Sequence, residues 1–127
     1  MDSAVLEKIP TFAALTAEEK HAIATWANEA SVSAGSIIVH EGEYSYEFFA
    51  IVEGQAEVLR AGDKVAELGP GDFFGEVGLL EKETRNATVQ AISPMRLLTF
   101  TSWDVRRLEK DAPEALAVIR TTLEQRR

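Results

Sequence analysis

The feature that most constrains the fold is a stretch of short β-rich runs between Ser36 and Thr101. The runs read SIIVH, EFFAIV, QAEVLR, KVAEL, NATVQAI and RLLTF, and turn residues separate them at 53–54, 61–63 and 69–72. Such short strands with frequent turns predict an antiparallel sandwich, jelly roll or barrel. Pro94 lies between the last two runs and is expected to interrupt pairing between them, because proline has no N–H to donate to a ladder.

Helical patterns flank this stretch on both sides. Residues 16–28 open with Thr16 and Glu19, the spacing of a capping box, and their apolar side chains predict one helical face: Ile23, Trp26 and Ala27. After the last run, Ser102 is the expected N-cap of a helix whose apolar residues are Trp103, Val105 and Leu108. A second helix is expected near Pro113, with an apolar face made of Leu116, Ile119 and Leu123.

The length of 127 residues suits one domain, and no linker divides the chain. The predicted fold class is mainly β with flanking helices, an antiparallel β-roll resembling a jelly-roll barrel. A single domain 1–127 is expected, with a helical lead-in at 1–35, the β-roll at 36–101 and C-terminal helices at 102–127. Phe48, Phe49, Phe73 and Phe74 are expected to be core residues or pocket walls.

Charge and composition exclude several function classes. The net charge of −8 disfavours sequence-independent binding to DNA or to an anionic membrane surface. It does not exclude one small anion, because a single arginine contact can outweigh screened surface charge. The chain has no cysteine, no secretory leader and no apolar run of about 18 residues, so a cytoplasmic location is expected without membrane insertion. His21 and His40 are scattered, so metal ligation is not expected.

Residues 69–89, GPGDFFGEVGLLEKETRNATV, interrupt the β pattern. The simplest interpretation is a helical turn starting near Gly75, whose unpaired N–H groups would favour an anion. Arg85 follows, and its guanidinium matches the geometry of a phosphate. The small residues Ala87 and Thr88 come directly after. From these residues alone, the segment is interpreted as an anion cradle.

The same segment resembles the phosphate-binding cassette of the cyclic nucleotide-binding domain family. The chain has FGEVGLL, then EKET, then RNATV, with the spacing of the family pattern preserved. Further stretches resemble the family's helical lead-in, first hairpins and closing helices: KIPTFAALTAEEKHAI, IIVHEGEYSYEFFAIVEGQAEV and TSWDVRRLEKDAPEALAVIR. Two positions depart from the pattern. Thr84 stands where proline is usual, and Asn86 stands where Ala, Ser or Thr is common, so the choice of base stays open.

The resemblance implies a role for each matching residue. Arg85 would hold the phosphate oxygens, and Glu76 would accept a hydrogen bond from the ribose 2′-hydroxyl. Gly75 and backbone N–H groups of Glu76, Asn86 and Ala87 would complete the cradle. The full set of expected ligand-binding residues is Phe74, Gly75, Glu76, Val77, Gly78, Leu79, Arg85, Asn86 and Ala87.

The function implied is reversible cyclic nucleotide binding, with cAMP favoured and cGMP possible, and with no catalytic residue, metal or catalytic cofactor. The C-terminal helices would transmit the presence of bound nucleotide to a regulated protein domain in cis or in trans. The oligomeric state stays open. Three alternatives are a metal-dependent enzyme on a related roll, a transcription factor, and a domain of this fold that binds no nucleotide and acts as a protein-interaction module. Scattered histidines disfavour the first, and the net charge disfavours the second. The third is the main alternative.

Overall fold

The computed structural model describes residues 1–44, 47–75 and 86–125, and of residues 122–125 only the backbone. The helical elements are η1 (Ser3–Lys8), α1 (Pro10–Ala13), α2 (Ala17–Trp26), α4 (Ser102–Asp111) and α5 (Pro113–Gln125). The strands are β1 (Asn28–Val32), β2 (Ile37–Val39), β3 (Glu47–Glu53), β4 (Ala56–Arg60), β5 (Asp63–Leu68), β6 (Phe73–Phe74), β7 (Thr88–Ala91) and β8 (Met95–Thr101).

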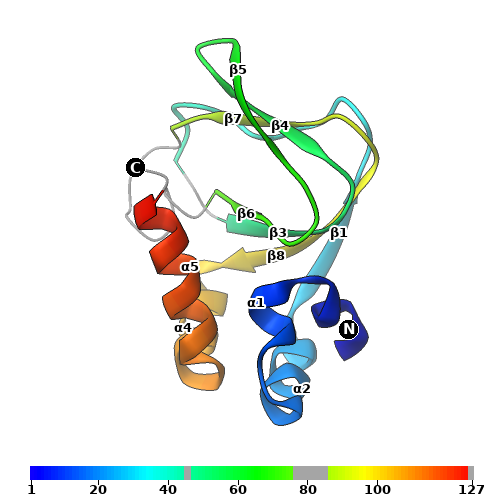
Figure 1. Ribbon diagram of the computed structural model, residues 1–127, viewed down its shortest axis with the longest axis vertical. Coiled ribbons are helices and arrows are strands. Elements are labelled where there is room, and N and C mark those ends of the chain that lie inside the picture. Colours follow the sequence, from blue (N-terminus) through cyan, green and yellow to red (C-terminus); the bar gives the residue numbers. More distant parts are fainter. Residues whose placement is uncertain (45–46, 76–85, 126–127) are drawn as a thin grey trace.

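These strands form two antiparallel sheets with the orders β1-β8-β3-β6 and β2-β7-β4-β5. The helices from both ends of the chain gather on one side of the strands (Figure 1). The expected fold class, mainly β with flanking helices in an antiparallel roll, is confirmed. The two strands on either side of Pro94, β7 and β8, belong to different sheets, as the proline predicts.

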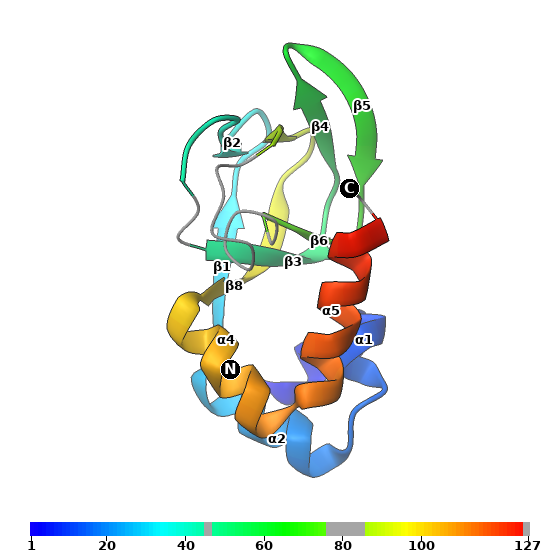
Figure 2. The same ribbon diagram turned by 90° about the vertical axis from the view of Figure 1, so that its left-hand side faces the viewer.

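One core lies between the helices and the sheet β1-β8-β3-β6. Its largest fully buried side chains include Phe12, Phe48 and Phe100, and the rings of Phe48 and Phe100 stack with centroids 4.8 Å apart. On α5, Leu116 and Ile119 are buried in the same core, and Figure 2 shows α4 below β3, with α5 rising from it toward the level of β6. The expected apolar face of the second C-terminal helix is confirmed at these two residues, and the side chain of Leu123 lies outside the described ones.

A second core lies between the two sheets. It contains Phe49, Ile51 and Leu97 from the helix-covered sheet and Val39 and Val89 from the other. Successive residues of β3 therefore point into the two cores in turn, and Phe48 to Val52 are all buried. The four phenylalanines expected in the core or in pocket walls, Phe48, Phe49, Phe73 and Phe74, are all buried.

Of the two N-caps predicted from the sequence, one is confirmed and the other is wrong. The capping box of Thr16 and Glu19 is confirmed. The second expected cap, Ser102, is wrong, because Thr101 is the N-cap and forms a capping box with Asp104. Trp103 is not part of the buried face: it is 67% exposed, and the Arg106 guanidinium lies 4.9 Å from its ring centroid.

Two strands were not predicted. The first, β1, lies within the expected helical lead-in, at NEASV, where only Val32 is a residue typical of strands. It forms because it pairs with β8 over its whole length, from Asn28 with Thr99 to Val32 with Met95. The second, β6, has only two residues, which pair with Phe49 and Ala50 of β3.

Candidate functional site

The predicted cassette connects the two sheets. It leaves the helix-covered sheet at β6 and enters the other sheet at β7. Of the expected site residues, the structure describes Phe74, Gly75, Asn86 and Ala87. The others, together with the expected helical turn, lie outside the described residues: Glu76, Val77, Gly78, Leu79 and Arg85. The structure therefore defines both flanks of the cassette.

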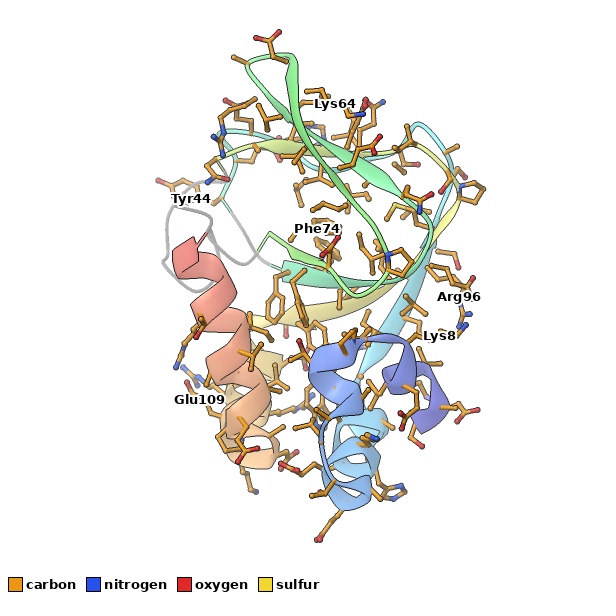
Figure 3. All side chains as sticks on the ribbon, viewed as in Figure 1. Lys8, Tyr44, Lys64, Phe74, Arg96 and Glu109 are labelled. Carbon is orange, nitrogen blue, oxygen red and sulfur yellow. The ribbon has the colours of Figure 1, made fainter. Side chains whose placement is uncertain are left out.

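Phe74 fixes the first flank by burial. The residue is 2% exposed, and its ring stacks on that of Phe49 with centroids 5.0 Å apart. Figure 3 shows it pointing into the space between the two sheets. The backbone pairing of Phe49 with Phe74 holds the chain beside β3. Phe74 is therefore a core residue that sets where the cassette begins.

Gly75 turns the chain directly after this strand. Its φ of +83° lies in the left-handed region, where side chains with a Cβ are disfavoured. A Cβ here would also lie 3.2 Å from the backbone oxygen of Glu47 and 3.4 Å from the Cα of Phe48. Conformation and close approach to β3 both favour glycine at this position.

Ala87 lies on the second flank. The whole residue is 7% exposed, and its backbone N–H has no hydrogen-bond acceptor among the described residues. A buried N–H without an acceptor is costly, because most such groups in proteins are satisfied. An anion placed against this N–H would satisfy it. The side chain of Asn86, by contrast, is exposed.

Three residues outside the cassette hold this flank. The Arg60 Nε donates to the backbone oxygen of Asn86 at 3.2 Å. The Thr88 hydroxyl accepts from the Glu41 N–H at 3.0 Å, and a Glu41 carboxylate oxygen accepts from the Ala61 N–H at 2.9 Å. Sequence reasoning did not identify Glu41, Arg60 or Ala61. They lie in two separate places, Glu41 in the turn after β2 and Arg60 with Ala61 at the end of β4, and no periodicity or motif connects the two.

The described residues include no group of three or more His, Cys, Asp or Glu side chains that could hold a metal ion. Among those same residues, no helix is both long and apolar enough to cross a bilayer.

A model of the cyclic nucleotide-binding domain family matches residues 29–111. The chain belongs to this family. The match confirms the resemblance seen in the cassette, and it includes both described flanks. Cyclic nucleotide-binding domains of solved structure share the fold as well: cAMP-bound PfPKA-R superimposes with a TM-score of 0.84 at 21% identity, over 97% of this chain and 43% of that one.

Curated relatives include proteins of two kinds. The cAMP-dependent protein kinase regulatory subunit of Schizosaccharomyces pombe is 36% identical over 82% of this chain. A cyclic nucleotide-gated potassium channel of Rhizobium etli is 40% identical over 76% of it. The chain spans about a quarter of the length of these relatives, 26% and 27%. One is a regulatory subunit and the other a gated channel, and neither is named for a catalytic activity.

Proposed function

We propose that this chain is a regulatory module that reversibly binds a cyclic nucleotide, with cAMP preferred over cGMP. The observation that carries the proposal is the complete cassette sequence between two structurally defined flanks, Gly75 and Ala87. The buried Ala87 N–H, which has no acceptor among the described residues, supplies one donor for the phosphate. The name of the yeast relative, a cAMP-dependent regulatory subunit, supports cAMP.

The residue roles follow from the family pattern. Arg85 holds the phosphate oxygens through its fork of donors, and Glu76 accepts from the ribose 2′-hydroxyl. Gly75, with the N–H groups of Glu76, Asn86 and Ala87, completes the cradle. All of these groups position a ligand, and none is assigned as a nucleophile or general base. The module therefore binds without catalysing a reaction, in the cytoplasm, and regulates a protein domain in cis or in trans.

The C-terminal helices α4 and α5 are proposed to pass the effect of ligand binding to the regulated domain. Leu108 of α4 and Ile119 of α5 share the core beneath β3 and β8, and Arg120 pairs with Glu109 across the two helices at 3.2 Å. A ligand can move α5 only by binding more tightly when α5 is in one position than in another. Hydrogen exchange across residues 113–125 is expected to change on saturation with cAMP; unchanged protection would contradict this role.

The binding site is tested by calorimetric titration of the wild type and of Arg85→Leu with cAMP and cGMP. Removing one partner of a desolvated charged contact costs about 2–5 kcal/mol, which is roughly thirtyfold or more in Kd. Arg96→Leu is the matched control, because Arg96 pairs with Glu29 and Glu53 on β1 and β3. An unchanged Kd in a folded Arg85→Leu protein would contradict the phosphate role. A wild type that binds neither nucleotide would favour the protein-interaction module instead.

A further inference from the structure

The sheet β2-β7-β4-β5 is called the open sheet below, because none of the described helices covers it. A closed ring of hydrogen bonds joins three segments of the chain at this sheet. Thr88, at the start of β7, accepts from the Glu41 N–H. The Glu41 carboxylate accepts from Ala61, just after β4, and the preceding residue, Arg60, donates to the oxygen of Asn86. The chain from Asn86 to Thr88 closes the ring. The ring therefore encloses residues 86–88, near the end of the cassette.

The hydrogen bond from Arg60 to the Asn86 carbonyl also orients the N–H of Ala87. The carbonyl of Asn86 and the N–H of Ala87 belong to the same peptide group, which is planar and trans, so the two bonds point in opposite directions. When Arg60 Nε holds the carbonyl at 3.2 Å, the N–H of Ala87 is directed to the other side of the peptide. Hydrogen bonds that share a group also polarise one another, so the donor becomes stronger.

The charge of Arg60 is available for this contact. Among the described residues Arg60 has no carboxylate within ion-pair distance, whereas Lys64 on the neighbouring strand pairs with Glu67 at 2.7 Å. The Arg60 side chain therefore donates a charge-assisted hydrogen bond to a peptide carbonyl.

The turn that carries Arg60 is held in an uncommon conformation. Ala61 has a φ of 52°, and no other described residue except glycine has a positive φ. A residue with a Cβ is disfavoured there unless its surroundings hold it. The Glu41 carboxylate accepts from the Ala61 N–H at 2.9 Å and supplies that constraint.

We propose that Arg60 is a positioning residue for the anionic ligand: it orients the Ala87 N–H toward the phosphate, and Glu41 holds the turn that presents Arg60. The inference rests on the proposed function for the identity of the ligand. It concerns residues outside the family cassette, and their contribution is to direct a backbone donor. Since the ring is exposed to solvent, removing it is expected to weaken binding several-fold and to leave the fold intact.

The first test needs no ligand. In free protein labelled with ¹⁵N, Arg60→Met is expected to lower the order parameter of the Ala87 amide. Lys64→Met is the matched control: it removes the same charge from the adjoining strand of the same hairpin, and the Ala87 amide is expected to keep its order parameter. An Ala87 amide as ordered in Arg60→Met as in Lys64→Met would overturn the proposal, whatever the protein binds.

The second test is titration of the same variants with cAMP. Arg60→Met is expected to raise Kd by about fivefold, the size of one hydrogen bond, and Lys64→Met by less than about twofold. Arg60→Lys, which keeps a charged donor, is expected to recover part of the loss. Glu41→Gln, which keeps an oxygen acceptor, is expected to bind more tightly than Glu41→Ala. Equal losses in Arg60→Met and Lys64→Met would show a general charge effect and overturn the positioning role. A wild type without cAMP binding would contradict the proposed function alone, because the amide measurement still decides the role of Arg60.

Discussion

The two flanks of the cassette are anchored in different ways. On the β6 side, Phe74 is buried and stacked on Phe49, and Gly75 lies against the backbone of β3. On the β7 side, Asn86 is exposed, and exposed hydrogen bonds hold its peptide and the residues after it. The first flank is therefore fixed by burial, whereas the second is fixed mainly by polar contacts.

The two sheets explain this difference. The sheet that contains β6 has helices on one face and the other sheet on its opposite face, so five successive residues of β3 are buried. The other sheet has one face in solvent, and its edge strand β5 is exposed from Asp63 to Glu67. Burial on both faces makes contacts expensive to change. An exposed polar anchor can be altered at lower cost.

The largest expected loss of stability comes from a substitution in the helix-covered sheet. Phe100 is fully buried and contacts three aromatic rings, those of Phe12, Phe48 and Trp26. Phe100→Ala is expected to lower the free energy of unfolding by about 3–5 kcal/mol. Val65→Ala on the open sheet, where the side chain is 52% exposed, is expected to change it by less than about 0.5 kcal/mol. Urea unfolding measures both, and similar losses would contradict the contrast between the sheets.

A smaller effect is expected at two turn glycines with similar backbone angles. Gly54 has a φ of +93° and Gly62 a φ of +85°, so alanine costs about 1–2 kcal/mol at either position. At Gly54 the added Cβ would also clash with the backbone oxygen of Pro94 and lie 2.9 Å from the Cα of Met95, whereas at Gly62 nothing lies within 4 Å. Gly54→Ala is therefore expected to cost about 2–4 kcal/mol in total. Equal unfolding midpoints for the two variants would show that the contact at Gly54 relaxes freely.

Patterns within a continuous stretch of sequence predicted much of the fold. The run EFFAIV predicted β3, Thr16 with Glu19 predicted the start of α2, and Pro113 predicted the start of α5. Strand β1 was missed because only Val32 of NEASV is a residue typical of strands, and the segment becomes a strand only by pairing with β8. Local propensity cannot show a partner that is distant along the chain.

The candidate site likewise contains residues that the sequence identifies and residues that it does not. The cassette is a continuous motif, so its residues were identified from sequence alone. The contact between Arg60 and Asn86 joins residues 26 positions apart, and neither belongs to a pattern that includes the other. Only the pairing of β4 with β7 brings them together. The residues proposed to bind the ligand directly belong to a sequence motif, whereas Arg60 and Glu41, proposed to orient a binding group, belong to none.

The smallest expected effects come from two exposed ion pairs, one on each sheet. In the helix-covered sheet, a hydrogen bond from Lys8 and its charge, with a further contribution from Arg96, lower the pKa of Glu53. This network connects η1 with β3 and β8, three elements distant in sequence. In the open sheet, a hydrogen bond to Glu67 on the same strand raises the pKa of Lys64. The first pair connects parts of the fold, and the second is local to β5.

The contributions of the two ion pairs to stability are expected to be lost at opposite ends of the pH range. Since the pKa of Glu53 is lowered on folding, its contribution to stability is present above the ordinary glutamate pKa and is lost as pH falls through the folded value. The pKa of Lys64 is raised, so its contribution is present below the ordinary lysine pKa and is lost as pH rises through the folded value. Glu53→Gln should therefore lower the unfolding midpoint near pH 7, and this deficit should shrink as the pH falls below the ordinary glutamate pKa and through the lowered folded value. Lys64→Met should have a smaller effect, since its pair spans three residues of one strand, and that effect should fade only above about pH 10. Thermal unfolding of both variants across this range measures the two profiles. If the Glu53→Gln deficit stayed constant down to pH 3, the carboxylate charge would not be what connects η1 to the sheet.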